Sequence, residues 1–198
     1  MLQKFWHRWR HALLALAFAL GCVPTIAVAQ LKPDVATVKA GSIEISAKPI
    51  ESFNRTGPAE SHFGRLDWRG GLVLTSTNKN FGGWSGLIMD PDGKTFISIS
   101  DSGAWLTGEL NYSGDKPSGI SNARLGPLLN TDGVPFKRGR DRDSEAIALV
   151  NGSVSAGSFL VAFEQNHRIL SYDVTRDGFS PARSSVPLPE DEIGRAHV

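Results

Sequence analysis

Four acidic residues of the sequence offer the chemistry of a cation site. Asp101 and Glu164 each follow a predicted strand at matching positions of a repeated pattern, and Asp143 and Glu145 stand at the start of its second copy. Ca²⁺ binds about six to eight oxygen ligands, and a bound cation lowers the pKa of an attacking water. We therefore predict metal-assisted hydrolysis, with Asp101 and Glu164 as ligands of Ca²⁺ and Asp143 and Glu145 as catalytic residues.

The same acids also have a purely structural interpretation. In this interpretation the acids accept hydrogen bonds from turn amides, as acidic side chains often do, or form ion pairs with Arg142 and Arg168. The sequence alone leaves both interpretations open.

A run of basic residues precedes Asp143. It contains Arg140 and Arg142, and a guanidinium group binds phosphate through two parallel hydrogen bonds. We predict that these two arginines bind the phosphate of a small-molecule phosphate ester. The alternative is a solvated surface loop, because segments of mixed charge are commonly exposed.

A serine nucleophile is the rival chemistry, for another class of ester. The segment Gly83-Trp84-Ser85-Gly86-Leu87 lacks the last glycine of the G-x-S-x-G motif, and a predicted strand follows where that motif requires a helix. His62 and His167 are the histidines left to act as a base once the two ends of the chain are set aside. We do not expect a catalytic triad.

Short apolar runs separated by turn residues must position these side chains. The runs are rich in β-branched and aromatic residues, and none shows the period of a helix over a dozen residues, so the sequence predicts an all-β fold. The expected strands are 72–76, 84–89, 95–100, 105–110, 145–150, 158–163 and 168–174. Turns are expected at 90–93, 151–152 and 177–178, and residues 111–143 are expected to form a long excursion with one strand near 123–129.

An internal repeat organises these strands. Each copy consists of a strand, a turn, a strand that ends in an acid, a short loop and a third strand; the copies begin near Ser85 and Glu145. This unit resembles most of a propeller blade, and a blade needs neighbours to cover its faces. We predict an incomplete β-propeller of antiparallel blades, with a β-sandwich as the alternative.

The first 29 residues have the features of a secretory signal peptide. Three basic residues precede an apolar stretch from Ala12 to Val23, and Ala27-Val28-Ala29 provides the small residues of a cleavage site. We predict cleavage after Ala29 and a periplasmic or secreted protein without stable membrane insertion. A lipoprotein anchored at Cys22 is the alternative.

The last seven residues, 192–198, match the translation of a common sequencing adapter. We interpret them as an artefact and expect the natural protein to continue past Asp191. The expected organisation is a signal peptide at 1–29, a lead-in segment at 30–60, a partial propeller domain at 61–191 and the adapter-derived tail.

Charge and cysteine content exclude two classes of function. Residues 30–191 contain 17 Lys and Arg against 19 Asp and Glu, a net charge of −2, and no cysteine. A nucleic-acid-binding protein that relies on positive charge is therefore not expected. Thiol nucleophiles, thiolate metal sites and disulfides are likewise excluded from this part of the chain.

Ordered motifs over residues 61–190 resemble those of the phytase-like family, labelled "esterase-like activity of phytase". The motifs are the segments 81–87, 90–94, 98–103, 143–148, 163–164 and 168–169. The resemblance implies an exported β-propeller with a hydrolase role on phosphate or other esters. A propeller without catalytic activity, which binds a ligand or an envelope partner, is the alternative, and the oligomeric state is left open.

Overall fold

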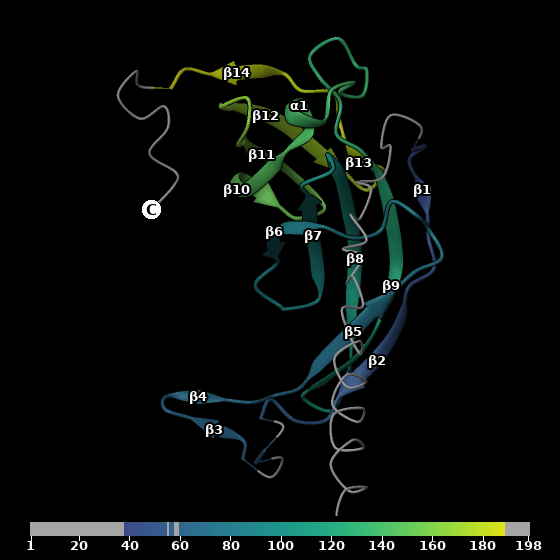
Figure 1. The fold of residues 1–198 in the computed structure, drawn as a ribbon, viewed down its shortest axis with the longest axis vertical. Coiled ribbons are helices and arrows are strands. Elements are labelled where there is room, and N and C mark those ends of the chain that lie inside the picture. Colours follow the sequence, from purple (N-terminus) through teal and green to yellow (C-terminus); the bar gives the residue numbers. More distant parts are fainter. Residues whose placement is uncertain (1–37, 55, 58–59, 189–198) are drawn as a thin grey trace, which may run out of the picture. The chain divides into compact units, whose positions relative to one another are not determined.

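The computed structural model describes residues 38–54, 56–57 and 60–188 (Figure 1). Antiparallel strands make up almost all of the regular structure in this part of the chain, so the predicted all-β class is confirmed. The described helix is α1 (Gly139–Arg142), a single short turn. None of the described helical structure is long and apolar enough to cross a membrane.

The first sheet has the strand order β1-β9-β8-β7-β6. Its strands are β1 (Gly41–Ser42), β6 (Trp84–Met89), β7 (Thr95–Ser100), β8 (Ala104–Ser113) and β9 (Lys116–Pro127). The predicted turn between β6 and β7 is present: the amide of Gly93 donates to the carbonyl of Asp90 (2.8 Å), and Gly93 has φ +70°. A positive φ is accessible to glycine without steric cost, which explains the residue type in this turn.

The second sheet has the order β10-β11-β12-β13, and β14 also pairs with β12. Its strands are β10 (Ser144–Ser153), β11 (Ala156–Phe163), β12 (Arg168–Thr175), β13 (Gly178–Phe179) and β14 (Ser184–Val186). Two small ribbons complete the described structure, β2 (Ser46–Ile50) with β5 (Gly71–Thr75) and β3 (His62–Phe63) with β4 (Leu66–Asp67).

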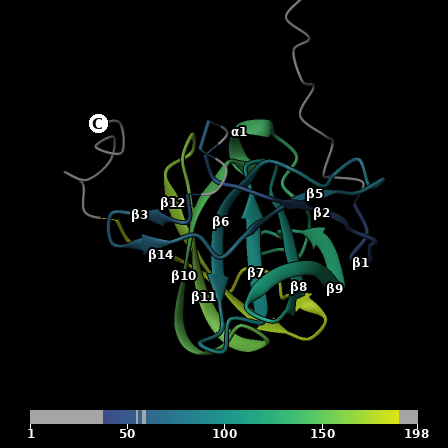
Figure 2. The same ribbon diagram turned by 90° about the horizontal axis from the view of Figure 1, so that it is seen from below.

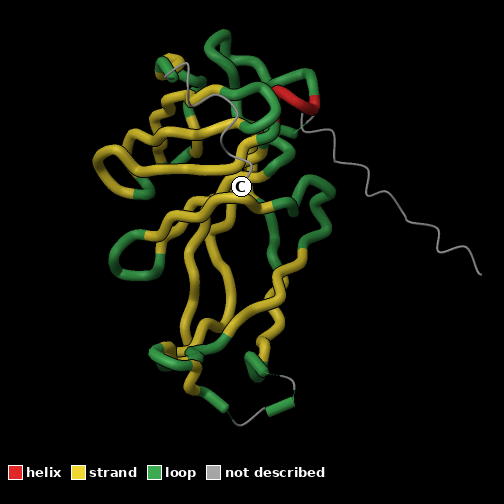
Figure 3. Tube along the Cα trace, turned by 60° about the vertical axis from the view of Figure 1, so that its left-hand side comes forward, coloured by secondary structure: helices red, strands yellow, loops and turns green. Residues whose placement is uncertain are grey.

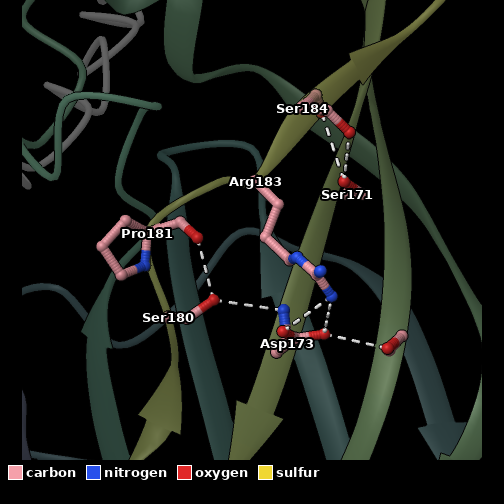
Figure 4. A network of polar contacts seen from close by, with 7 residues as sticks. Ser171, Asp173, Ser180, Pro181, Arg183 and Ser184 are labelled. Atoms are coloured by element: carbon pink, nitrogen blue, oxygen red, sulfur yellow. Dashed lines mark hydrogen bonds and ion pairs between the residues drawn. The ribbon is translucent and has the colours of Figure 1, made fainter.

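A polar network holds the end of the second sheet in place (Figure 4). The carboxylate of Asp173 on β12 accepts hydrogen bonds from Arg183 (3.0 and 3.2 Å) and from Ser158 (2.9 Å). Ser180 donates its amide to the carbonyl of Asp173, and Ser184 bonds to Ser171 through the hydroxyl groups (2.9 Å). The segment from β13 to β14 is thereby fixed along β12.

The predicted repeat is confirmed, and the two copies share a bulge. A bulge interrupts the pairing of β6 with β7 between Trp84 and Gly86, and a bulge at the matching place interrupts the pairing of β10 with β11 between Ser144 and Ala146. Ser85 and Glu145 are therefore the extra residues of two equivalent bulges.

Equivalent backbone hydrogen bonds also close the two copies of the repeat. The amide of Asp101 donates to the carbonyl of Gly83, and the amide of Glu164 donates to the carbonyl of Asp143, each at 2.9 Å. Gly83 and Asp143 therefore occupy the same position in the two copies, as do Asp101 and Glu164.

The two sheets pack front to back. In the first sheet, Ile97 and Ile99 point from β7 into the core; in the second sheet, Phe159 and Val161 point into it from β11. Ile97 and Leu160 occupy equivalent positions in the two copies, and we call the face that carries them the front of each sheet. Ile97 lies in the shared core, whereas Phe159 and Val161 reach it from the face of β11 opposite to Leu160. The front of the first sheet therefore packs against the back of the second. In Figure 2 the green strands β10 and β11 lie beside the teal strands β6 and β7.

Close approach at this interface requires a small residue on β6. A Cβ on Gly86 would lie 2.9 Å from Cγ2 of Ile147 on β10. The hydroxyl of Ser144 also donates to the carbonyl of Ser100 across the same interface (2.7 Å). A second cluster, with Phe96 and Leu106, fills the back of the first sheet beneath residues 38–45.

Two local predictions are wrong. The strand expected near 123–129 is present as part of β9, but the excursion is shorter than expected, because β8 extends to Ser113 and pairs with residues 116–121 of β9 in a largely exposed hairpin. The turn expected at 151–152 lies at 154–155 instead, since Gly152, with φ +84°, belongs to a bulged part of β10.

Three predictions stay predictions. The described sheets do not close into a propeller, although their front-to-back packing is the arrangement of neighbouring blades. The signal peptide and the adapter-derived tail lie outside the described residues, and so do the two alternatives for anchoring at the N-terminal end.

Candidate functional site

The predicted acidic residues gather at one end of the two sheets. Carboxylate oxygens of Asp143, Glu145 and Glu164 lie within 4.8 Å of one another. Asp143 ends the segment before β10, Glu145 is the bulge residue of β10, and Glu164 follows β11. The bulge brings Glu145 to the same end as Asp143 and Glu164, because the extra residue changes the direction in which its side chain points.

These three carboxylates, which we call the acidic cluster, differ in burial. Asp143 is 3 % exposed, whereas Glu164 is half-buried and Glu145 is exposed. A buried carboxylate needs hydrogen-bond donors, and Gln165 donates from its side-chain amide to Asp143. The cluster therefore has a fixed, buried end and an end that is open to solvent.

The electrostatics of the cluster are visible in Glu145. Although Glu145 is exposed, partial desolvation by the surrounding protein raises the pKa of this carboxyl, and the negative charge of Asp143 raises it further. A hydrogen bond from Ser85 acts in the opposite direction, and the more weakly acting charges of Glu164 and Asp101 also raise the pKa. Repulsion among the acids is thus only partly compensated, which is a state that a cation would relieve.

Asp101 comes to the site from the first sheet. Its carboxylate lies against the backbone of Gly83, where a Cβ would overlap it. The charge of Asp101 acts on Glu145, but its oxygen atoms are not among the three that lie within 4.8 Å of one another. Asp101 is therefore a neighbour of the acidic cluster that belongs to the other copy of the repeat.

The structure places the two predicted phosphate-binding arginines on α1, which Figure 3 draws in red among loops. Arg140 is exposed. Arg142 packs over Gly103: a Cβ added to Gly103 would lie 2.9 Å from the Cβ of Arg142. Because Gly103 belongs to the turn after Asp101, Arg142 lies where the loops of the two sheets meet.

The serine chemistry gains no support from the described residues. Ser85 lies within β6, not at a strand-to-helix turn, and its hydroxyl also bonds to the carbonyl of Gly83 (3.3 Å). His62 pairs with Asp67 in the ribbon of β3 and β4, and His167 is exposed in the turn before β12.

Sequence reasoning missed two partners of the acids, Gln165 and Ser85. Gln165 directly follows the acid Glu164, and Ser85 occupies the repeat position of Glu145. Comparing the two copies position by position was the signal that could have identified Ser85.

Comparison with known protein families identifies what the chain is similar to. The family model described as "Phytase-like: Esterase-like activity of phytase" matches residues 79–196. No curated protein and no solved structure matches the chain. The matched range contains both copies of the repeat and all four predicted acids.

Proposed function

The chain belongs to the phytase-like family, and we propose that it hydrolyses phosphate esters with the help of a divalent cation bound at the acidic cluster. The observation that carries this proposal is the set of three carboxylates within 4.8 Å of one another. Carboxylate oxygens are hard ligands of the kind that Ca²⁺ prefers, so the donor set fits this ion.

In this proposal each acidic side chain of the site has its own role. Asp143 and Glu164 hold the cation, the nearby charge of Asp101 adds attraction from the first sheet, and the exposed Glu145 accepts a proton from the attacking water. A bound divalent cation neutralises phosphate charge and lowers the pKa of water. The buried Asp143, fixed by Gln165, keeps the ligand set from rearranging.

The basic side chains of α1 suit an anionic substrate. The exposed Arg140 is free to approach a phosphate from solvent, and Arg142 stands at the meeting point of the two loops. Guanidinium groups bind phosphate oxygens in pairs, so these arginines favour a phosphate ester over an uncharged ester. The substrate class is thus a small molecule that carries phosphate.

The test compares hydrolysis of an aryl phosphate and an aryl acetate with added Ca²⁺ and with a chelator. We expect phosphate release that the chelator abolishes and that Asp143→Asn reduces by a factor of about 100, as expected for loss of a metal ligand and its charge. The matched control is Asp177→Asn, which changes an exposed acid in the turn before β13.

Two outcomes would contradict the proposal. Phosphate release that persists in the chelator would exclude a cation-dependent reaction. Turnover of neither ester by a folded protein would instead favour the propeller that binds a ligand or an envelope partner without catalysis.

A further inference from the structure

We propose that Arg168 is a positioning residue that holds the loop 136–143 against the second sheet and so keeps Asp143 beside Glu164. This inference rests on the proposed function, because it concerns how the acidic cluster is assembled. Arg168 begins β12 and is half-buried. It is not one of the residues assigned to the cation or the substrate.

The aromatic contacts of Arg168 bridge the loop and the sheet. Its guanidinium carbon lies 4.0 Å from the ring centre of Phe163 on β11 and 4.9 Å from that of Phe136, the first residue of the loop. The two rings also pack edge to face, with centres 5.4 Å apart. A cation between two rings is attracted to both, so the guanidinium group fixes the start of the loop.

The hydrogen bonds of Arg168 fix the other end of the loop. One guanidinium nitrogen donates to the carbonyl of Asn166 (2.8 Å) and the other donates to the carbonyl of Asp141. The side-chain amide of Asn166 donates to the carboxylate of Asp141 (3.0 Å). The planar fork of arginine can serve two carbonyls at once, which the single nitrogen of lysine cannot do in the same geometry.

These contacts lead directly to the acidic cluster. The anchored carbonyl of Asp141 lies two residues before Asp143, whose own carbonyl accepts the amide of Glu164 (2.9 Å). Release of Asp141 would remove one of the constraints that place Asp143, whose carboxylate also accepts a hydrogen bond from Gln165. Ion pairing of Arg168 with the acids was one of two interpretations that the sequence left open; the structure adds contacts with backbone carbonyls and aromatic rings.

The loop itself provides a direct measure of anchoring. Lys137, Arg138, Arg140 and Arg142 are four trypsin sites within it. An anchored loop is cut slowly because a protease needs locally unfolded chain, and the rate of cutting reports how often the loop opens. This measure requires no cation, substrate or catalytic activity.

The experiment uses Arg168→Gln and Arg168→Lys, with Arg183→Gln as the matched control. Arg183 is also an arginine of the second sheet, but it binds Asp173 (3.0 Å). We expect cleavage within 137–142, mapped by mass spectrometry, to be about tenfold faster in Arg168→Gln, as for loss of one cation–π contact and one charged hydrogen bond. The cleavage rate of Arg168→Lys should lie between the rates of Arg168→Gln and the unmodified protein. The control Arg183→Gln should be cleaved as slowly as the unmodified protein.

Calcium affinity, measured by calorimetry on the same proteins, connects anchoring to the site. We expect Arg168→Gln to weaken Ca²⁺ binding by a factor of about ten while Arg183→Gln leaves it unchanged. If Arg168→Gln does not fold, Phe136→Leu removes one ring from the guanidinium and tests the same anchor.

The outcomes separate the two proposals. Unchanged cleavage within 137–142 in both variants would overturn the role of Arg168. Faster cleavage with unchanged Ca²⁺ affinity would show that the loop does not place Asp143 for the cation, and would also overturn it. If the unmodified protein binds no Ca²⁺, the proposed function fails, and the cleavage rates alone decide whether Arg168 anchors the loop.

Discussion

The two large sheets are copies of one repeat, but they differ in how much of each is covered. In the first sheet every residue of β7 from Phe96 to Ser100 is buried, because the second sheet covers its front and residues 38–45 cover its back. In β11 of the second sheet, buried residues alternate with half-buried ones. Equivalent residues therefore have different burial, and the difference comes from their neighbours.

The two copies also differ in charge at the end where the site lies. The positions that hold Gly83, Ser85 and Asp101 in the first copy hold Asp143, Glu145 and Glu164 in the second. The same backbone thus carries one acid in one copy and three in the other. The repeat builds the scaffold, and acids at two positions that hold Gly83 and Ser85 in the first copy concentrate the acidic residues in the second copy.

Replacing a large apolar side chain by alanine at one pair of equivalent positions tests how completely each sheet is covered. Of the comparisons between the two copies, we expect this one to show the largest effect, a loss of stability. Ile97 is fully buried, and its equivalent Leu160 is half-buried. Ile97→Ala should lower the free energy of unfolding by about 2–5 kcal/mol, because it leaves a cavity between the sheets. Leu160→Ala should cost about 1 kcal/mol, since its side chain keeps part of its contact with solvent.

Chemical denaturation of both variants measures this comparison. The denaturant dependence should be the same for both if the folded state is unchanged. Equal losses of stability would mean that the front of the second sheet is covered as completely as that of the first.

Replacement of equivalent acids tests the difference in charge. Glu164→Gln removes a member of the acidic cluster, and Asp101→Asn changes the equivalent residue of the first sheet. We expect Glu164→Gln to weaken Ca²⁺ binding by roughly tenfold or more and Asp101→Asn to weaken it by a smaller factor, because direct ligands matter more than nearby charges. Calorimetric titration measures both, and a larger effect at Asp101 would place the cation nearer to the first sheet.

Much of the fold was predictable because local composition and the repeat agree. The alternation of strand and turn residues located β6, β7, β11 and β12, and equivalence of the two copies linked Asp101 to Glu164. The inner part of β9 was predicted as a strand near 123–129, but its outer part was missed because it is polar, contains Pro117 and Gly119, and is stabilised by pairing with β8. Pairing with a neighbouring strand overrides local preference.

The details of the site depend on information that composition does not contain. The bulge at Glu145 follows from the register of β10 against β11, and the contact of Gln165 with Asp143 follows from how a loop returns to the sheet. The carbonyl and aromatic contacts of Arg168 could not be predicted for the same reason. Its carbonyl and aromatic partners come together only in the folded chain.

The smallest expected effect concerns the bulge residues, Ser85 in the first copy and Glu145 in the second. Partial desolvation and the neighbouring acids raise the pKa of Glu145, so the folded state favours its protonated form, and the favourable contribution is lost as the pH rises through that pKa. Glu145→Gln, which stays neutral, should therefore raise the melting temperature at pH 7 in a chelator, and the gain should disappear as the pH falls below the usual range of a glutamate. Ser85→Ala should lower the melting temperature at pH 7, because it removes the hydrogen bond that lowers the pKa of Glu145.

Melting curves from pH 4 to pH 8, with Glu109→Gln on the exposed part of β8 as the control, measure both changes. A gain in melting temperature that is independent of pH would contradict this prediction. It would mean that the bulge residue Glu145 is not repelled by the charges of the neighbouring acids.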